Sequence, residues 1–581
     1  MLAGVEPGID GLRHLLLPAL HAVHDVTGWI SPGGLDEICR RLGVAPAEAY
    51  GVASFYGLFS MEPRPPRVLH VCVDLACRMA GAGAVVQTLP RRGTDTAGPG
   101  SGVAPWTWEE SPCLGLCERA PAALVVDYGP HRHEAVLAPA TPAMLAGALD
   151  GGAAAAPGEP QVAAAVPQRG DPSLVLLRRV GMVDPTSLDD YRAQRGYAAL
   201  RRAVAMGPAA VIREVTDSKL LGRGGAAFPA GRKWAAVAAQ PVRPHLLVCN
   251  ADESEPGTFK DRVLLEGDPF AVLEAMTITG YATGCERGYV YLRGEYPRAL
   301  RTLERAIAAA YDRGFLGPDV MGLGFAFDVE VRRGAGAYIC GEETAIFNSI
   351  EGYRGEPRNK PPFPVEVGLF GLPTVVNNVE TLVNVLPILE RGAAVYAGVG
   401  TERSTGTKLF AVCGSVRAPG VYEVPFGVTL RDMLELAGGL PPGRALQGVL
   451  LGGAAGAFVA PDGLDVPLTF EGAAAAGATL GSGVVMVVDD SVDLAGFLLR
   501  IAAFFKDESC GQCVPCRIGT VRQEEILERL AAGRPLVSVA DELALLADVG
   551  TVMRDASICG LGQTAASAID SAIRRLEVFS R

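Results

Sequence analysis

The sequence lacks the features that direct a chain into or across a membrane. Its N-terminus, Met-Leu-Ala-Gly-Val-Glu, has neither the basic region nor the continuous apolar core of a signal peptide. Apolar runs are short: residues 494–505 cannot span a bilayer, and Asp489, Asp490 and Asp493 precede them. We therefore expect a cytoplasmic protein with no membrane span.

Positive charge is also scarce relative to negative charge. The 581-residue chain carries 52 Lys and Arg against 64 Asp and Glu, a net charge of −12, with no basic stripe. Nucleic acid is not an expected partner, because binding a phosphate backbone requires clustered cations. The composition, 49% hydrophobic and 20% charged, is typical of globular proteins. The length exceeds that of one hydrophobic core, so we expect several domains.

Disulfides are not expected either, because thirteen cysteines in a reducing compartment are usually ligands or small core residues. Residues 509–517, Ser-Cys-Gly-Gln-Cys-Val-Pro-Cys-Arg, place Cys510, Cys513 and Cys516 at C-x2-C-x2-C spacing. Three sulfurs from one tight loop and a fourth from the distant Cys559 suit a [4Fe–4S] cluster. A structural zinc site is the alternative, although this spacing strains a tetrahedral site and fits the face of a cube.

A second cysteine set, Cys72, Cys77, Cys113 and Cys117, has C-x4-C and C-x3-C spacing. An apolar run at 68–73, a helical stretch at 80–89 and expected strands at 106–109 and 124–126 predict a small α/β layer around it. Two cysteine pairs can hold the two irons of a [2Fe–2S] cluster. A zinc knuckle or a set of redox cysteines is the alternative, but these spacings are looser than those of most zinc sites.

The remaining segments predict helices before this cysteine set and a mixed module near the end. Residues 9–60 repeat leucine at helical spacing, Ser31 precedes Pro32 as a helix N-cap, and Gly43 is a helix stop. Residues 150–172 are rich in Ala, Gly and Pro, a linker composition. Within 405–490 we expect a small β-grasp-like module with strands at 409–413, 420–424, 449–451 and 484–488 and a helix at 430–437. The chain from 492 to 581 is expected to be helical.

The region 175–400 contains several glycine-rich or polar segments that follow apolar ones. In residues 219–234, glycines 222, 224 and 225 let backbone N–H groups approach a phosphate or a planar ring, and Arg223, Arg232 and Lys233 supply charge. Gly222 also begins a G-x-G-x-x-A pattern, but no clean strand precedes it, which disfavours a Rossmann site. An apolar strand at 246–249 leads into the acidic loop 250–257, where α/β folds often place ligand contacts.

Together, these segments resemble the flavin-containing NADH-binding subunit of respiratory complex I over residues 175–581. Residues 9–150 resemble the small [2Fe–2S] subunit of the same complex, fused in front. The resemblance is carried by the motifs at 222–225, 250–257, 340–345, 360–364, 377–381 and 508–517. The fused layout is similar to the diaphorase subunits of soluble NAD-reducing hydrogenases and NAD-dependent formate dehydrogenases.

The resemblance implies a multidomain α/β fold that binds FMN, NAD(H), one [4Fe–4S] cluster and one [2Fe–2S] cluster. The implied domains are N-terminal helical (1–65), thioredoxin-like [2Fe–2S] (66–150), linker (151–174), FMN- and NAD(H)-binding (175–400), β-grasp-like or SLBB (401–490) and helical [4Fe–4S] (491–581).

The resemblance also assigns residues to the cofactors. It places the FMN phosphate at Gly222, Arg223, Gly224 and Lys233, and the ribityl and isoalloxazine parts at Asn250, Asp252, Asn377 and Asn378. Phe228 and Phe363 are expected to stack on the adenine, and Glu253 and Glu343, as catalytic residues, to border the nicotinamide site. The remaining expected cofactor-binding residues are Gly225, Tyr338, Gly341, Glu342, Lys360 and Thr381. All eight cluster cysteines named above are present, so both clusters should form.

One position departs from the commoner family pattern: Ala227 stands where glycine is usual, and we expect its methyl group to be tolerated. The remaining cysteines, at 39, 249, 285, 340 and 413, are expected to be small buried residues.

The family also implies a hetero-oligomer with a catalytic partner subunit that carries further iron–sulfur clusters and a molybdenum, tungsten or NiFe centre. We favour a formate dehydrogenase, with a hydrogenase, an NADH-quinone oxidoreductase or an electron-bifurcating complex as alternatives. A non-catalytic iron–sulfur scaffold is the alternative class, which the intact flavin loop, Glu253 and Glu343 oppose. The preference for NAD over NADP follows only from the family.

Overall fold

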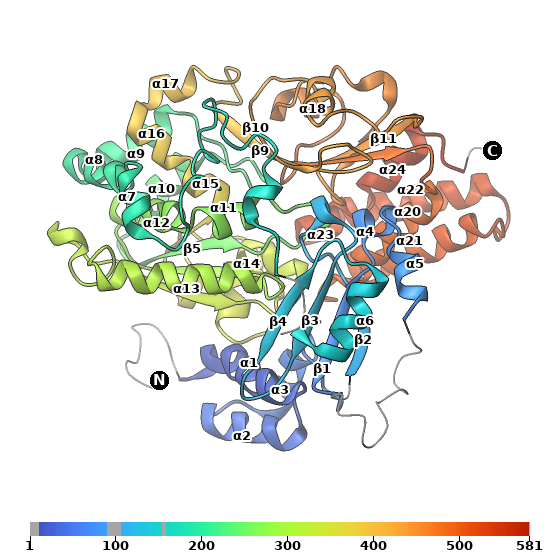
Figure 1. The fold of residues 1–581 in the computed structure, drawn as a ribbon, viewed down its shortest axis with the longest axis horizontal. Helices are drawn as coiled ribbons and strands as arrows, with labels where there is room; N and C mark the ends of the chain where they lie inside the picture. The colour runs from blue at the N-terminus through green and yellow to red at the C-terminus, as the bar shows by residue number, and fades with distance from the viewer. Residues whose placement is uncertain (1–10, 90–105, 154–157, 580–581) are drawn as a thin grey trace.

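The computed structural model describes residues 11–89, 106–153 and 158–579. Both ends of the chain, residues 90–105 of the expected [2Fe–2S] domain and residues 154–157 of the expected linker lie outside the described residues. The described residues form three sheets and a C-terminal helical region (Figure 1). This confirms the expected multidomain α/β fold. In the part of the chain that the structure describes, no helix is long and apolar enough to cross a membrane.

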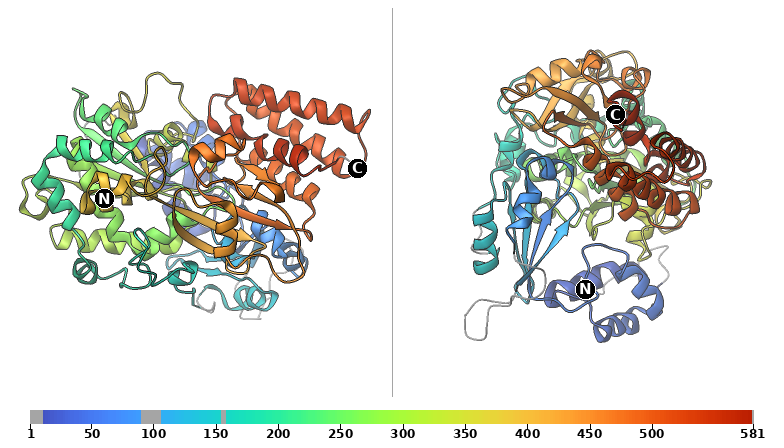
Figure 2. Two further views of the ribbon diagram at one scale, coloured as in Figure 1. Left: turned by 90° about the horizontal axis from the view of Figure 1, so that it is seen from above. Right: turned by 90° about the vertical axis from the view of Figure 1, so that its right-hand side faces the viewer.

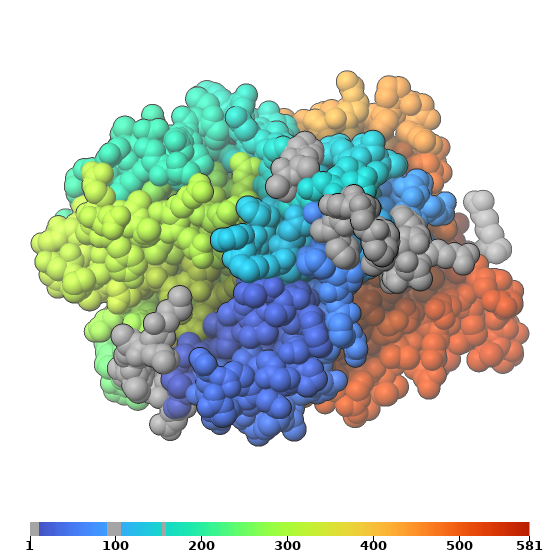
Figure 3. Space-filling model, turned by 60° about the horizontal axis from the view of Figure 1, so that its bottom comes forward, coloured from blue at the N-terminus to red at the C-terminus, as the bar shows by residue number. Residues whose placement is uncertain are grey.

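The N-terminal helices form a small domain that packs beside the first sheet (Figure 3). They are η1 (Arg13–Leu15), α1 (Leu16–Thr27), α2 (Pro32–Leu42) and α3 (Pro46–Ala53). Ser31 caps α2 by accepting a hydrogen bond from the N–H of Gly34, and α2 ends at Gly43 with φ 68°, as expected. The Tyr56 hydroxyl donates to Ser349 Oγ at 2.7 Å, which joins this domain to the flavin domain.

The first sheet carries the second cysteine set. Its elements are β1 (Arg67–Cys72), α4 (Leu75–Met79), α5 (Ala82–Gln87), β2 (Trp106–Ser111), η2 (Cys117–Arg119), β3 (Ala123–Asp127), β4 (His133–Leu137) and α6 (Pro142–Gly151). The strand order is β2-β1-β3-β4, with β1 and β2 parallel and the other pairs antiparallel. The expected strands at 68–73, 106–109 and 124–126 are therefore confirmed.

The segment with linker composition is packed where it is described. It contains η4 (Val162–Ala165), and Val162, Ala163 and Ala165 are buried. The Glu423 carboxylate accepts hydrogen bonds from the backbone N–H groups of residues 175–177 at 2.9–3.1 Å. Composition predicted a linker at 150–172. Its described residues are held by burial of their apolar side chains, and the Glu423 carboxylate holds the residues that follow directly.

The flavin domain contains a parallel sheet of order β7-β6-β5-β8, flanked by helices. Its strands are β5 (His245–Ala251), β6 (Cys285–Leu292), β7 (Asp328–Arg333) and β8 (Thr374–Asn378). Its helices are α7 (Leu188–Ala193), α8 (Ala198–Met206), α9 (Pro208–Asp217), α10 (Ala230–Ala238), α11 (Lys260–Gly267), α12 (Pro269–Thr283), α13 (Pro297–Asp312), η5 (Val320–Gly322), η6 (Tyr338–Gly341), α14 (Glu343–Ile350), η7 (Leu369–Gly371), α15 (Val379–Val383), α16 (Val385–Arg391) and α17 (Ala393–Ala397). Ligands commonly bind beyond the carboxyl ends of parallel strands.

The third sheet confirms the strands expected between 405 and 490. Its order is β10-β9-β13-β11-β12. The elements are β9 (Thr407–Gly414), β10 (Gly420–Pro425), α18 (Leu430–Leu436), β11 (Leu446–Leu451), β12 (Ala457–Val459), η8 (Pro461–Gly463), α19 (Phe470–Ala475) and β13 (Val484–Asp489).

The C-terminal region is helical, as expected, and lies beside the third sheet (Figure 2). It consists of α20 (Leu494–Asp507), α21 (Val514–Ala531), α22 (Val539–Ala556), α23 (Gly560–Thr564) and α24 (Ser567–Arg575).

Candidate functional site

Two adjoining cavities lie beyond the carboxyl ends of β5 and β8. The inner cavity, of about 390 Å³, is lined by the flavin domain, the third sheet's loops and the start of α23. The outer cavity, of about 650 Å³, is lined by the flavin domain alone. Gly224, Asn250, Gly341, Glu342 and Asn378 line both cavities, so the two form one continuous site.

The structure brings together all but one of the residues expected to bind cofactors. Those that line the two cavities are Gly222, Gly224, Gly225, Phe228, Lys233, Asn250, Asp252, Glu253, Tyr338, Gly341, Glu342, Glu343, Lys360, Phe363, Asn377, Asn378 and Thr381. They come from five segments spread between residues 222 and 381, and the parallel sheet brings those segments to one edge.

The exception is Arg223, whose side chain lines neither cavity. Its guanidinium is fully buried and donates to Tyr396 Oη at 3.0 Å and to the Thr405 carbonyl at 2.7 Å. It also lies over the Phe426 ring, 4.6 Å from the centroid. The expected contact between this charge and a phosphate is therefore not supported, because the guanidinium joins the glycine loop to the third sheet's domain.

The glycine loop itself fits a flat or phosphate-bearing ligand. A Cβ at Gly224 would lie 3.0 Å from Asn378 Cβ, so only glycine leaves this wall of the cavity open. No strand precedes the loop within the flavin domain's described sheet, which agrees with the disfavoured Rossmann interpretation. Ala227 has φ 52°, in the left-handed region that glycine adopts without strain. The family's usual glycine at this position therefore has a conformational reason.

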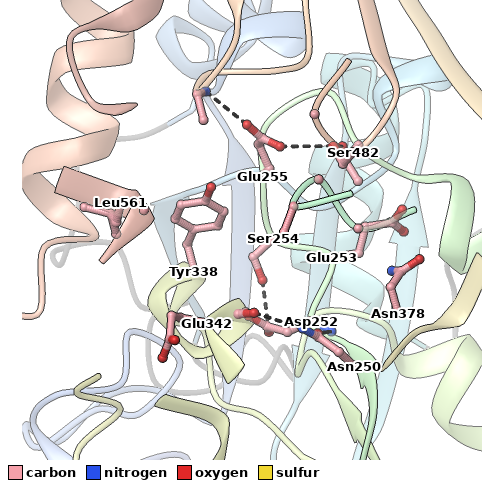
Figure 4. Close-up of a pocket in the computed structure, with 18 of the residues that line it drawn as sticks. Asn250, Asp252, Glu253, Ser254, Glu255, Tyr338, Glu342, Asn378, Ser482 and Leu561 are labelled. Carbon is pink, nitrogen blue, oxygen red and sulfur yellow. Dashed lines mark hydrogen bonds between the residues drawn. The ribbon is translucent and has the colours of Figure 1, made fainter. Parts of the chain in front are cut away.

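Glu253 lies at the inner wall (Figure 4), where its carboxylate binds the start of α11. It accepts hydrogen bonds from the N–H groups of Asp261 and Arg262 at 2.8 and 2.9 Å, and from the Tyr296 hydroxyl at 3.0 Å. Burial, followed by the charge of Asp261, raises its pKa to about 7. A carboxylate with three neutral donors is held in place, so Glu253 is a fixed part of the wall.

Asp252 offers an unsatisfied acceptor to the inner cavity. Its Oδ2 atom is buried and has no hydrogen-bond partner among the described residues, while Oδ1 accepts from Ser254 Oγ at 3.1 Å. Burial raises its pKa well above the ordinary value. An orphaned acceptor beside the open glycine wall fits a ligand that carries hydroxyl or N–H donors, such as a ribityl chain.

Sequence analysis missed the part of the inner cavity that other domains supply. Glu255 lies in the motif at 250–257 but was not expected to bind a cofactor. Its carboxylate accepts hydrogen bonds from Ala455 N and Ser482 Oγ, both at 3.0 Å (Figure 4). Burial raises the pKa of Glu255 to about 7. Ser482 lies in a loop before β13 and Leu561 in α23, and only tertiary structure reveals that they line the site.

The outer cavity combines exposed aromatic rings with a charged pair of lysines. Phe228 and Phe363 are about half exposed, 48% and 52%. The Glu343 carboxylate accepts from Lys360 Nζ at 2.8 Å and Lys233 Nζ at 3.4 Å. Although burial alone would raise it, these two ammonium groups lower the pKa of Glu343. This arrangement fits a dinucleotide, with rings for a base and lysines for phosphates.

The C-terminal cysteines converge beside the inner cavity. Cys516 lies close to Cys510, Cys513 and Cys559, and the Cys559 sulfur accepts hydrogen bonds from the N–H groups that follow it at the start of α23. N–H donors stabilise a cluster-bound thiolate, so the donor set fits a [4Fe–4S] cluster. Leu561, two residues after Cys559, lines the inner cavity. The cluster loop and the flavin site therefore share a wall.

The other four cysteines gather as a buried group without a disulfide. Cys72 contacts Cys77 and Cys113, and Cys113 Sγ lies 3.4 Å from Cys117 Sγ. Four buried sulfurs joined by these contacts fit a [2Fe–2S] cluster, and Cys413 lies beside Cys117 at the edge of the group.

Two fully buried arginines of the flavin domain hold the loop of this second group. Arg293 donates to the Cys113 carbonyl at 2.6 Å and also to the Glu253 carbonyl at 2.6 Å. Arg262, whose backbone N–H binds the Glu253 carboxylate, donates to the Gly115 carbonyl at 2.9 Å. The inner cavity and the [2Fe–2S] loop are thus connected through single side chains.

Family models match nearly every part of this architecture. The thioredoxin-like [2Fe–2S] ferredoxin model matches residues 8–146, and the Nuo51 FMN-binding domain model matches 215–387. The SLBB domain model matches 409–454, and the model of the NADH-ubiquinone oxidoreductase-F iron–sulfur binding region matches 496–578.

Curated relatives and solved structures agree with these models. The chain is 45% identical over 402 residues to the second F-type subunit of NADH-quinone oxidoreductase from Rhizobium meliloti, covering 69% of this chain and 95% of the relative. It is 46% identical over 394 residues to the HndC subunit of the NADP-reducing hydrogenase of Solidesulfovibrio fructosivorans, covering 67% and 79%. A chain of an NAD⁺-reducing [NiFe]-hydrogenase superposes with a TM-score of 0.82 at 33% identity, covering 98% of this chain and 94% of that one. The protein belongs to the family of NADH-oxidising flavoproteins with FMN and iron–sulfur clusters that includes the F-type subunits of NADH-quinone oxidoreductases.

Proposed function

We propose that this chain is the diaphorase subunit of a hetero-oligomer and exchanges electrons between NAD(H) and a catalytic partner subunit. The observation that carries the proposal is the continuous double cavity with the [4Fe–4S] cysteine loop at its inner end. Bound FMN supplies the exchange between two-electron hydride chemistry and one-electron transfer to clusters.

Within this function, the residues of the outer cavity bind and orient the dinucleotide. Phe228 and Phe363 provide ring surfaces for its adenine, and Lys360 provides a cation for its phosphates. Glu343, held ionised between Lys233 and Lys360, borders the nicotinamide site and disfavours accumulation of negative charge there, which promotes release of NADH when NAD⁺ is reduced.

The residues of the inner cavity and of its junction with the outer cavity hold FMN and exclude water. Gly224, with Gly222 and Lys233 from the outer cavity, binds its phosphate, and Asn250, Asp252, Asn377 and Asn378 bind its ribityl and isoalloxazine parts. No separate proton abstraction from carbon is needed, so Glu253 is proposed to border the site without acting as a general base.

The next question is which catalytic partner this subunit serves. The similarity to a hydrogenase chain extends across 98% of this fused chain, which supports a hydrogenase as partner, whereas the comparisons lend no support to formate dehydrogenase, which the sequence analysis favoured. Complexes purified through this chain should therefore contain nickel; molybdenum or tungsten would instead support formate oxidation.

The diaphorase activity has a direct test. The purified chain should contain FMN and about six iron atoms, two from [2Fe–2S] and four from [4Fe–4S], and should reduce an artificial electron acceptor with NADH. Clusters without FMN and without NADH-dependent activity would instead indicate an iron–sulfur scaffold.

A further inference from the structure

A group of buried charges lies directly behind the glycine loop. It consists of Lys260 and Asp261 at the start of α11, Glu380 in α15 and Lys408 in β9, which we call the buried ion cluster. All four side chains are at most 3% exposed. Removing charges from water costs several kcal/mol each, so their retention at this place calls for an explanation.

The two lysines of the buried ion cluster are paired unequally. Lys260 Nζ lies 2.8 Å from Asp261 Oδ1 and 2.9 Å from Glu380 Oε2. Lys408 Nζ has its nearest carboxylate in the described residues, Glu380 Oε2, at 3.7 Å. Its hydrogen-bond contacts are the carbonyls of Arg223 at 3.4 Å and Ser482 at 3.5 Å, and the ammonium also lies 5.7 Å from the centroid of the Phe410 ring. Lys408 therefore keeps more of its charge uncompensated than Lys260 does.

The charge balance around Lys408 is positive. The cluster itself contains two cations and two carboxylates, and the adjacent guanidinium of Arg223 binds only neutral acceptors among the described residues. Glu253, a further carboxylate that interacts with Lys260, has a pKa of about 7 and is partly protonated at neutral pH. Burial, opposed by Glu380, lowers the pKa of Lys408 to about 8, which is consistent with an ammonium that lacks full pairing.

Lys408 also touches both loops that border the inner cavity. Arg223 belongs to the glycine loop, whose residues Gly224 and Gly225 line the cavity, and Ser482 lines it from the opposite loop. Asp261, a member of the cluster, lines the inner cavity together with Asn378, whose Nδ2 donates to Asp261 Oδ2 at 2.6 Å. An ammonium at this junction acts on a ligand in the cavity through a low-dielectric wall.

We propose that Lys408 is a positioning residue that stabilises the reduced flavin relative to the oxidised flavin. The inference rests on the proposed function. A hydride from NADH brings two electrons and one proton, so the flavin gains one negative charge until it takes up a second proton. A positive charge behind the cavity wall favours this negatively charged reduced flavin. The contacts of Lys408 with the carbonyls of Arg223 and Ser482 hold the glycine loop and the Ser482 loop in a fixed position beside the flavin.

The test uses the full chain loaded with FMN. The ratio of reduced to oxidised flavin is measured against a redox dye at fixed pH for wild type, Lys408→Gln, Lys408→Arg and the exposed-lysine control Lys219→Gln. Glutamine keeps a donor for the two carbonyls but has no charge. We expect Lys408→Gln to shift the ratio about tenfold toward oxidised flavin, about 30 mV for a two-electron couple, and Lys408→Arg and Lys219→Gln to shift it less than threefold.

FMN affinity and iron content, measured on the same samples, separate the explanations. Flavin lost in Lys408→Gln but retained in Lys408→Arg supports a role for the charge. A ratio within twofold of wild type in Lys408→Gln, equal shifts in the Gln and Arg variants, or flavin lost from both with iron intact would each overturn the inference. Wild-type protein that binds no FMN would refute the proposed function itself.

Discussion

Replacing Glu343 by glutamine tests how the outer cavity separates substrate from product. The carboxylate lies between Lys360 and Lys233, so the substitution leaves Lys233 without this anion and Lys360 with Glu342 alone, at 2.9 Å. NADH carries one more negative charge than NAD⁺, at the nicotinamide ring. For a separation of ~8 Å and an effective dielectric constant of ~40, one unit charge contributes about 1 kcal/mol, or about fivefold in affinity.

Glu343→Gln should therefore increase the preference for the reduced dinucleotide over NAD⁺ about fivefold, while FMN content stays unchanged. Binding of NAD⁺ and of an unreactive tetrahydro analogue of NADH can be measured by calorimetry on the FMN-loaded protein. Glu286→Gln removes the same charge from an exposed position at the opposite end of the sheet, where β6 begins, and should change neither affinity. An unaltered affinity ratio in Glu343→Gln would refute a nicotinamide-facing role, and loss of FMN would place the residue in the flavin site instead.

Three further predictions follow from the site. Because the folded-state pKa of Glu255 is raised to about 7, the folded protein keeps a proton that the unfolded chain releases near pH 4.5, and the free energy of unfolding should fall as pH rises between these values. At pH 7.5, Glu255→Gln should be about 1–3 kcal/mol more stable than wild type in thermal unfolding. The same pH dependence of stability in both proteins would contradict this cost of burying the carboxylate. Cys559→Ala should remove about four of six iron atoms and leave the [2Fe–2S] electron paramagnetic resonance signal, while the matched variant Cys285→Ala, a buried thiol beside Thr283, should keep all six; four atoms lost from both would contradict a specific ligand role for Cys559. Gly224→Val should lower FMN content at least tenfold with an unchanged melting temperature, because its side chain would enter the cavity wall at Asn378; retained FMN would exclude this wall from the flavin site.

The residues expected to bind cofactors could be placed at one site from sequence because they lie in short motifs, some at the end of a strand or the start of a helix and others, such as those at 222–225 and 360–364, in glycine- or proline-rich loops. The parallel sheet then brings those motifs together, as it does for Asn250 at the end of β5 and Asn378 at the end of β8. Side-chain direction was not predictable in the same way. Arg223 sits in the correct loop, yet its partners Tyr396 and Thr405 come from elements that no local pattern connects with it.

Contacts between domains were the least predictable part. Ser482, in a loop before β13, and Leu561, in α23, line the inner cavity because three domains pack together there. The described segment 158–172 had the composition of a linker, but its Gln168 exchanges hydrogen bonds with the backbone of Glu423, more than two hundred residues away. The Glu423 carboxylate also binds the N–H groups of residues 175–177, directly after the segment, so contacts from another domain hold a stretch that composition alone marks as a linker.

The bridge formed by Arg293 has a consequence for assembly. This guanidinium joins the carbonyl of Glu253 in the flavin site to the carbonyl of Cys113 in the [2Fe–2S] loop. In a two-chain arrangement, the contact with Cys113 would be lost whenever the smaller chain dissociated, and Arg293 would keep only its partners in the flavin domain, Glu295 and the Glu253 carbonyl. Fusion makes this encounter intramolecular and fixes the ratio of flavin sites to [2Fe–2S] sites at synthesis, so neither site matures in surplus over the other.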